Sequence, residues 1–287
     1  YILHNRSIFF SNDDEVKHFL EKRSIENSKK HQQPATLNVK SNLDKLTLND
    51  MQVFRFNFRH EKNQKILYLH GGYNTLQPSP FHWRLLDKLT LNTLHEVVLP
   101  IYPKSPDYHY LETFKAIRDV YNQLVEEVGA NNIVMMGDGS GGGLALSFVQ
   151  SLINDNQEVP RKLFLLSPLL DATLTNPNIT KTLEENDILV SRFGVHQLMK
   201  SWTNDLPLSD ARISPLYGTL KGLPPIYMYG GGREILSPDM HAFTHALEEC
   251  GNDVEFKEYP KMVHDFPIYP IRQSHKVLKH ITKSILE

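Results

Sequence analysis

The sequence is poor in cysteine. Its single cysteine, Cys250, cannot form a disulfide within the chain. Because disulfides accumulate in oxidising compartments, we predict a cytoplasmic location. The chain also lacks an apolar run of about 20 residues, the length that a helix needs to cross a bilayer, and its start lacks the apolar segment of a secretory leader. We therefore expect no membrane span.

An excess of charge of one sign is also missing. The chain carries 31 Lys and Arg against 33 Asp and Glu, a formal net charge of -2. This balance argues against nucleic acid or an anionic membrane as a partner. The 14 histidines show no metal-binding spacing such as H-E-x-x-H. We expect neither a metal nor another cofactor.

Short apolar segments that alternate with helical segments are present throughout. The 287 residues, of which 40% are hydrophobic, suffice for one large or two small domains. The expected strands are residues 52–58, 65–72, 95–103, 132–138, 161–170, 224–232 and 253–260. The expected helices are residues 13–24, 111–129, 141–153, 237–251 and 271–287. This alternation predicts an α/β fold with a mostly parallel central sheet and helices on both faces.

Two segments depart from the alternation. Residues 1–50 are polar, contain one expected helix and are predicted to form an N-terminal helical cap and lead-in segment. Residues 51–287 then form the main domain. Within it, the stretch from Asp171 to about residue 215 is helix-prone without a clear strand. We predict that this stretch is a helical cap inserted over the sheet.

Four of the expected strands end in loops that are rich in glycine or carry titratable groups. In chain order, these loops are HGGY (70–73), GDGSGG (137–142), GGREIL (231–236) and MVHDF (262–266). In an open α/β sheet, ligands bind beyond the carboxyl ends of the strands. The sequence therefore predicts a site made of a glycine loop, a turn of small residues, an acid and a histidine.

With these motifs the sequence resembles the hormone-sensitive-lipase-like carboxylesterases of the α/β-hydrolase fold. That family carries H-G-G-G, then G-D-S-A-G-G at a nucleophile elbow, then an acid in G-x-x-E-x-L and a histidine in M-x-H-x-F. The resemblance runs from about residue 50 to the end and includes SPLLD and ISPLYG. It implies hydrolysis of small acyl esters by a serine, a histidine and an acid.

The resemblance assigns a role to each motif. Glu234 would orient the ring of His264, and His264 would act as the general base. The backbone N–H groups of Gly71 and Gly72 would bind the developing oxyanion, and Gly139 completes the predicted oxyanion hole. Without the family, the alternatives are a tight turn for the glycines, an ordinary core or surface histidine for His264 and a solvated ion pair for Glu234.

The turn of small residues leaves the identity of the nucleophile open. A gap-free alignment with G-D-S-A-G-G places Gly139 where the family has its serine and Ser140 on the small residue after it. Gly137 and Gly141 then stand at the flanks, where small residues are required. A shift by one residue would instead make Ser140 the nucleophile and place Asp138 at a flank. A third alternative is an introduced Ser-to-Gly change at position 139.

Three functions are compatible with this interpretation of the motifs. In the first, the chain is a carboxylic-ester hydrolase with Ser140, Glu234 and His264 as catalytic residues, since Ser140 is the serine available at the elbow. In the second, the chain is a non-catalytic ligand-binding or interaction protein of the same fold. In the third, His264 activates water directly. The expected partner is a small-molecule ester, and the assembly is open between a monomer and a homodimer.

Overall fold

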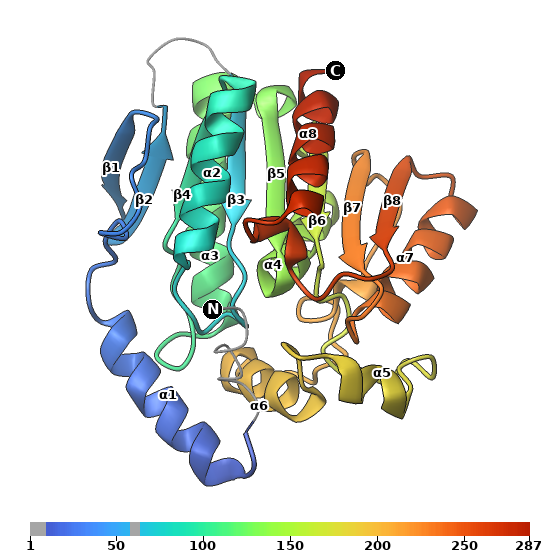
Figure 1. Ribbon diagram of the computed structural model, residues 1–287. Helices are drawn as coiled ribbons and strands as arrows, with labels where there is room; N and C mark the ends of the chain where they lie inside the picture. The colour runs from blue at the N-terminus through green and yellow to red at the C-terminus, as the bar shows by residue number, and fades with distance from the viewer. Residues whose placement is uncertain (1–9, 58–63) are drawn as a thin grey trace.

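An eight-stranded sheet forms the centre of the molecule. The computed structural model describes residues 10–57 and 64–287, and the strand order is β1-β2-β4-β3-β5-β6-β7-β8 (Figure 1). The strands are β1 (Leu43–Leu48), β2 (Met51–Phe56), β3 (Lys65–Leu69), β4 (Glu96–Pro100), β5 (Ile133–Asp138), β6 (Lys162–Leu166), β7 (Ile226–Gly231) and β8 (Val254–Tyr259). β2 runs antiparallel to both β1 and β4, and the remaining neighbours are parallel. The predicted mostly parallel sheet is confirmed.

Helices cover both faces of this sheet, as predicted. In Figure 1, α2 and α8 lie in front of the sheet and α3 and α4 lie behind it, while α7 packs against β7 and β8. The helices are α1 (Asp13–Asn27), α2 (Pro80–Thr93), α3 (Tyr110–Val128), α4 (Gly139–Asn154), α5 (Lys181–Asn186), α6 (Arg192–Thr203), α7 (Ser237–Glu249) and α8 (Arg272–Leu286). In the described part of the chain, no helix is both long and apolar enough to cross a membrane.

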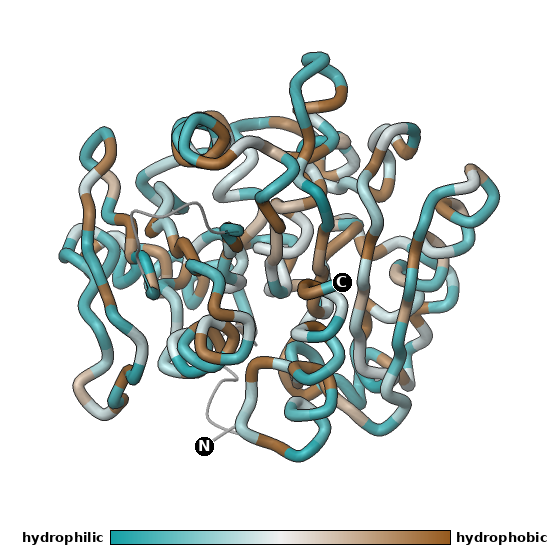
Figure 2. Tube along the Cα trace, turned by 90° about the horizontal axis from the view of Figure 1, so that it is seen from above, coloured by the Kyte–Doolittle hydropathy of each residue, from teal (hydrophilic) through white to brown (hydrophobic). Residues whose placement is uncertain are grey.

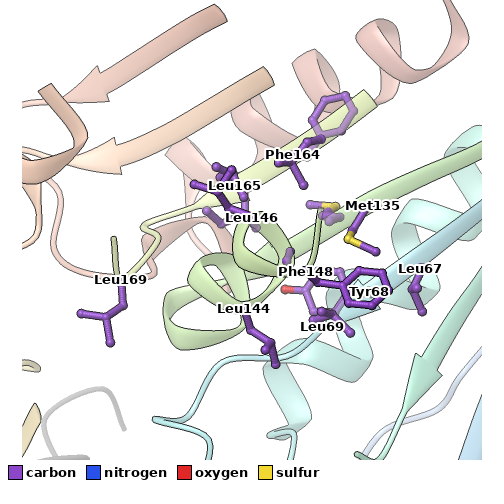
Figure 3. Close-up of a cluster of buried hydrophobic side chains, with 14 of the residues drawn as sticks. Leu67, Tyr68, Leu69, Met135, Leu144, Leu146, Phe148, Phe164, Leu165 and Leu169 are labelled. Carbon is purple, nitrogen blue, oxygen red and sulfur yellow. The ribbon is translucent and has the colours of Figure 1, made fainter. Parts of the chain in front are cut away.

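The core around α4 holds the small-residue turn in place. Every residue of β3 and β5 is buried, and side chains from β3, β5, β6 and α4 meet in one cluster (Figure 3). Figure 2 shows hydrophobic and hydrophilic positions alternating along the helices, as expected for elements with one buried side. Because protein interiors are closely packed, this cluster fixes the path of the chain from β5 into α4.

Strand β1 is not among the predicted strands, the first of which begins at residue 52. It is a half-buried edge strand, and its apolar residues do not keep a period of two. Asn49 and Asp50 connect β1 to β2 with φ of 47° and 65°, as in a type I′ hairpin turn. This Asn-Asp pair is the signal that would have predicted the hairpin. Phe58, the last residue of the expected strand, lies outside the described residues.

Helix α2 is also missing from the predicted elements. It follows Ser79 and begins at Pro80, a favoured first residue of a helix. Leu85, Leu86 and Leu89 are buried on one side of it with helical spacing. Both signals are present in the sequence, so this helix could have been predicted.

Two helices occupy the segment predicted to form a cap. In Figure 1, α5 and α6 lie below the carboxyl ends of the parallel strands, and α1 contacts α6. Gln197 Nε2 on α6 donates to Asp13 Oδ1 on α1 at 3.2 Å, so part of the N-terminal segment extends the cap. The domain boundaries at residue 50 and at residues 171–215 stay predictions. Strand β1, which precedes residue 50, is already part of the central sheet.

Candidate active site

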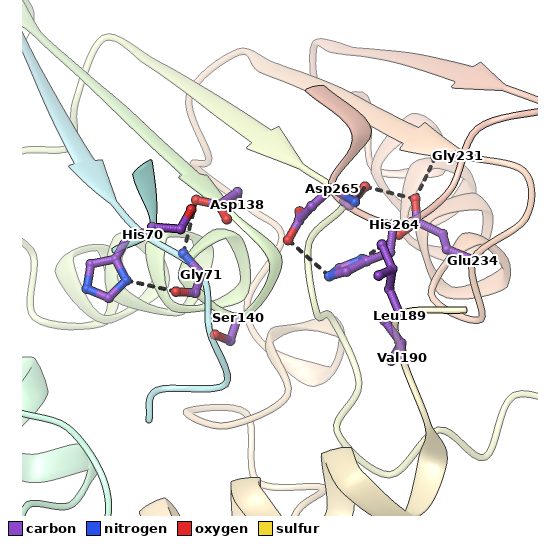
Figure 4. A network of polar contacts seen from close by, with 12 residues as sticks. His70, Gly71, Asp138, Ser140, Leu189, Val190, Gly231, Glu234, His264 and Asp265 are labelled. Carbon is purple, nitrogen blue, oxygen red and sulfur yellow. Dashed lines mark hydrogen bonds and ion pairs between the residues drawn. The ribbon is translucent and has the colours of Figure 1, made fainter. Parts of the chain in front are cut away.

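His264 and Glu234 form a hydrogen-bonded pair after strands β8 and β7. The Nδ1–H of His264 donates to Glu234 Oε2 at 2.7 Å (Figure 4). The other oxygen of Glu234 accepts from Ser167 Oγ at 2.8 Å and from the N–H of Gly231. Glu234 is fully buried, so these contacts hold its carboxylate in one orientation. The fold thus brings together the predicted acid and the predicted base.

The second ring nitrogen of His264 faces another carboxylate. Its Nε2 lies 3.1 Å from Asp265 Oδ2. Burial alone would lower the pKa of His264, but the carboxylates of Asp265 and Glu234 raise it well above its usual value. Burial, with the negative charges of Asp138 and Glu234, raises the pKa of Asp265 to about 6 against the effect of His264. Contacts with Glu234 and Asp265 on its two ring nitrogens thus favour the protonated form of His264.

The turn from β5 into α4 is so tight that two of its positions accept only glycine. A Cβ at Gly137 would stand 2.4 Å from the carbonyl oxygen of Gly141, and a Cβ at Gly141 would stand 2.2 Å from that of Leu69. Gly139 lies midway between them with φ of 51°, a conformation that side chains disfavour. The turn therefore has the geometry of an elbow centred on residue 139.

Gly141→Ala is expected to destabilise the fold, because its Cβ would meet backbone atoms that cannot move aside. Overpacking of this kind costs about 1–3 kcal/mol or more, so we expect a clear fall in Tm in a thermal unfolding experiment. Gly251→Ala is the control: it has φ of 72° and no atom within 4 Å of the added Cβ, so it carries only the backbone cost. Equal Tm values for the two variants would contradict the tight elbow.

Residue 139 points towards the histidine. A Cβ built on Gly139 would lie 3.5 Å from His264 Nε2 and 3.1 Å from Asp265 Oδ2. A hydroxyl oxygen one bond further out would come within hydrogen-bond distance of Nε2. The position that faces His264 therefore belongs to a residue that has no side chain.

Ser140 lies one residue further into α4 and is buried. Its Oγ accepts from the N–H of Asn74 at 3.2 Å, and Figure 4 shows it beside the segment of Gly71. Within residues 10–57 and 64–287, no hydrogen bond joins this oxygen to His264. Its own N–H belongs to the first turn of α4, where helix geometry leaves N–H groups without partners. Ser140 as the nucleophile stays a prediction.

The glycine loop after β3 packs against the same turn. The N–H of Gly71 donates to Asp138 Oδ1 at 3.0 Å, and Asp138 also accepts from Tyr68 OH at 2.6 Å and contacts His82 Nε2 at 2.9 Å. Burial alone would raise the pKa of Asp138, but the charge of His82 and these hydrogen bonds lower it. The N–H of Gly71 is thus engaged, whereas no hydrogen bond recorded among the described residues uses that of Gly72.

Most of these groups line one pocket at the carboxyl edge of the sheet. Its wall combines the glycine loop, the start of α2, the elbow, the cap and the segment after β8. The lining residues are Gly71, Gly72, Tyr73, Leu76, Gln77, Ser79, Phe81, His82, Asp138, Ser140, Leu189, His264, Asp265, Ile268 and Tyr269. Leu189 comes from the segment between α5 and α6, so the cap forms part of the pocket. No three His, Cys, Asp or Glu residues in the described part of the chain are grouped to hold a metal.

Two carboxylates and one histidine of the pocket were not predicted as site residues. Asp138 and Asp265 lie within the quoted motifs, next to Gly139 and His264, but sequence adjacency does not say where a side chain points. His82 lies on α2, the helix missing from the predicted elements. A correct assignment of that helix would have been the signal for His82.

Comparison with known proteins identifies the family of the chain. A family model described as the α/β-hydrolase fold matches residues 66–268. The chain belongs to the α/β-hydrolase fold family. An esterase of Acinetobacter venetianus is 34% identical over 208 residues, which are 72% of this chain and 68% of that protein. A triacylglycerol lipase of Mycobacterium tuberculosis is 29% identical over 77% of this chain, but the match spans only 46% of the lipase.

Solved structures share the whole fold of this α/β hydrolase. A crystal structure of a "putative esterase" from Staphylococcus aureus is 64% identical, with a TM-score of 0.97 over 100% of this chain and 97% of that one. An esterase of the bacterial hormone-sensitive lipase family has a TM-score of 0.82 at 20% identity, over 100% of this chain and 98% of that one. The predicted membership is confirmed, and the chain is an esterase- and lipase-like hydrolase by relationship.

Glu234→Gln is expected to lower turnover of an ester by about 100-fold or more, with a small change in Tm. The amide would face Nδ1 of His264 with its NH₂ group, which turns the ring to the wrong tautomer, while its oxygen still accepts from Ser167 and Gly231. Steady-state kinetics with a p-nitrophenyl ester and thermal unfolding measure both effects. A large fall in Tm with intact turnover would make Glu234 a structural residue only.

Proposed function

We propose that the chain hydrolyses small acyl carboxylic esters in this pocket without forming an acyl-serine. One observation supports the proposal: residue 139, whose Cβ would lie 3.5 Å from His264 Nε2, is a glycine and has no side chain. An ester carbonyl above Gly139 would meet water rather than a serine hydroxyl. The relatives named esterase and triacylglycerol lipase support a carboxylic ester as the substrate.

The oxyanion is stabilised by backbone groups. The N–H of Gly72 and the N–H of Ser140 are the donors we propose, because the N–H of Gly71 is engaged by Asp138. Ser140 takes the place in the oxyanion hole that was predicted for Gly139, and it contributes its backbone rather than its hydroxyl. The positive end of the α4 dipole adds to the stabilisation of a negative oxygen at this position.

Proton transfer is the role of His264. Its ring is oriented by Glu234 through the 2.7 Å hydrogen bond at Nδ1, and its Nε2 contacts Asp265 Oδ2 at 3.1 Å and lies 3.5 Å from the place of a Cβ on residue 139. A positioned histidine of this kind passes protons between water and the leaving alcohol. In the proposed reaction, water first adds to the ester carbonyl, and the alcohol is then eliminated.

Kinetics with p-nitrophenyl acetate and butyrate test this function. The unaltered protein should release p-nitrophenol steadily, without a burst equal to the enzyme concentration, because such a burst marks an acyl-enzyme. A fluorophosphonate probe should leave Ser140 unlabelled during many turnovers. A stoichiometric burst, or rapid labelling of Ser140 found by mass spectrometry, would contradict the proposal and make Ser140 the nucleophile.

A second candidate is a non-catalytic ligand-binding protein of the same fold. The contact of Asp265 with His264 Nε2 at 3.1 Å favours it, because the nitrogen that should act on a nucleophile is already occupied. This candidate predicts saturable binding of an ester with no hydrolysis above the level of His264→Ala. Equilibrium binding and turnover measured on the same ester distinguish the two functions.

A cytoplasmic location and the assembly are inferred from the sequence alone. The single cysteine suits a reducing compartment. A homodimer is proposed as an alternative to a monomer, and light scattering of the purified chain separates the two.

A further inference from the structure

We propose that Asp265 is a catalytic residue of this pocket: its carboxylate accepts the proton of the water that attacks the ester above Gly139. This inference rests on the proposed function and adds the base that water needs. Figure 4 shows the carboxylate of Asp265 next to the imidazole of His264, on the side away from Glu234. The two carboxylates therefore hold the ring from opposite nitrogens.

The carboxylate stands beside the space that a nucleophile would fill. A Cβ at residue 139 would lie 3.1 Å from Asp265 Oδ2 and 3.5 Å from His264 Nε2. A water in place of that side chain is therefore within hydrogen-bond reach of Asp265 as well as of His264. Geometry is the first requirement of a general base, and Asp265 meets it.

One oxygen of Asp265 has no partner in the protein. Among the residues that the structure describes, Oδ1 is buried and accepts no hydrogen bond, although the residue is 8% exposed and lines the pocket. A buried carboxylate oxygen without a donor is costly, so the pocket suits a ligand or a water at this oxygen. The N–H of Asp265 donates to Ser167 Oγ at 3.1 Å, which anchors the residue beside Glu234.

In this proposal Asp265 is the base and His264 is the acid, and their side chains are in contact. The pKa of Asp265, raised by burial to about 6, leaves its carboxylate ionised at neutral pH. The two neighbouring carboxylates outweigh the burial of His264 and raise its pKa, which favours a proton on Nε2. The other titratable groups that interact with Asp265 are Tyr68, Tyr73, His82, Asp138, Glu234 and Tyr269.

The reaction balances with water as the co-reactant. As the water oxygen bonds to the carbonyl carbon, one water proton passes to Asp265 and the carbonyl π electrons move to the oxygen. When the bond to the alcohol oxygen breaks, the leaving alkoxide takes the Nε2 proton of His264. The proton on Asp265 then crosses the 3.1 Å contact to Nε2. The products are a carboxylic acid and an alcohol, and both residues return to their starting states.

Asp265→Asn tests the proposal in the full chain. The amide keeps the size of the side chain but cannot accept a proton, so kcat should fall by about 100–10,000-fold. In the unaltered protein, kcat should rise with pH through about 6, because Asp265 must be ionised, and this limb should be absent from the variant. Asp253→Asn, the same change at an exposed position, is the matched control and should keep both the rate and the limb.

A serine at position 139 provides a sharper control. In Gly139→Ser, the introduced hydroxyl is the nucleophile and the neutral form of His264 is its base, so Asp265 is not needed to activate a water in the acylation step. Adding Asp265→Asn to that background should leave the rate of fluorophosphonate labelling unchanged or raise it, because Nε2 is freed. An equal loss in both backgrounds would show a structural role and overturn the proposal.

The outcomes separate this inference from the proposed function. No hydrolysis by the unaltered protein above the level of His264→Ala would overturn both. Burst-free hydrolysis that is unchanged in Asp265→Asn, with the pH limb retained, would overturn only the role of Asp265. If Asp265→Asn does not fold, Asp265→Ala with added formate replaces it: formate should restore part of the rate, and no rescue of a folded variant contradicts the proposal.

Discussion

Gly139→Ser is expected to convert the chain into a serine hydrolase that a fluorophosphonate labels stoichiometrically at position 139. The added Cβ would lie 3.5 Å from His264 Nε2, so its hydroxyl comes within reach of the base. A misplacement of about 1 Å can cost about 100-fold in rate, and we expect labelling at least about 100-fold faster than in the unaltered protein. The serine would adopt φ near 51°, at a cost of about 1–3 kcal/mol.

The control for this change is Gly139→Ala. It introduces the same Cβ, the same backbone strain and the same contact at 3.1 Å with Asp265 Oδ2, but no hydroxyl. It should therefore lose about as much stability in thermal unfolding and remain unlabelled. Mass spectrometry of the labelled peptide identifies the residue. Fast labelling of the unaltered protein at Ser140 would show instead that the elbow is shifted by one residue.

His264→Ala is expected to reduce ester hydrolysis by about 100–10,000-fold, the usual contribution of a positioned acid or base. The ring connects Glu234 to Asp265, and in the proposed reaction it protonates the leaving alcohol and then takes back the proton held by Asp265. Turnover of p-nitrophenyl butyrate by the two proteins measures the effect. His245→Ala, which removes an exposed histidine, is the matched control and should retain full activity.

Removal of this ring also leaves the buried side chains of Glu234 and Asp265 without the histidine that both of them contact. Glu234 is fully buried and Asp265 nearly so, and a buried charge that loses its partner is strongly destabilising. The Tm of His264→Ala should therefore fall as well. His264→Gln, which keeps a polar side chain between the carboxylates, should lose as much activity with a smaller fall in Tm. Full activity in either variant would exclude His264 as the proton-transfer group.

The sequence by itself determined the architecture. Parallel strands buried on both faces appear as continuous apolar runs, so β3 and β5 were predicted within a few residues of their observed ends. The weak elements were missed for physical reasons: β1 is a half-buried edge strand whose contacts come mostly from β2. The order of glycine loop, elbow, acid and histidine was also readable, because each follows a strand directly.

Only the tertiary structure decided what the side chains of the site face. Residues 139 and 264 are far apart in the chain, and the distance between the missing Cβ and Nε2 follows from how β5 and β8 are placed in the sheet. The hydrogen bond from the N–H of Gly71 to Asp138 likewise depends on the pairing of β3 with β5 in the sheet. Asp265 follows the histidine in sequence, yet its left-handed φ of 52° sets its carboxylate beside Nε2. A sequence motif specifies which residues reach the edge of the sheet, but directions and contacts between distant segments depend on packing.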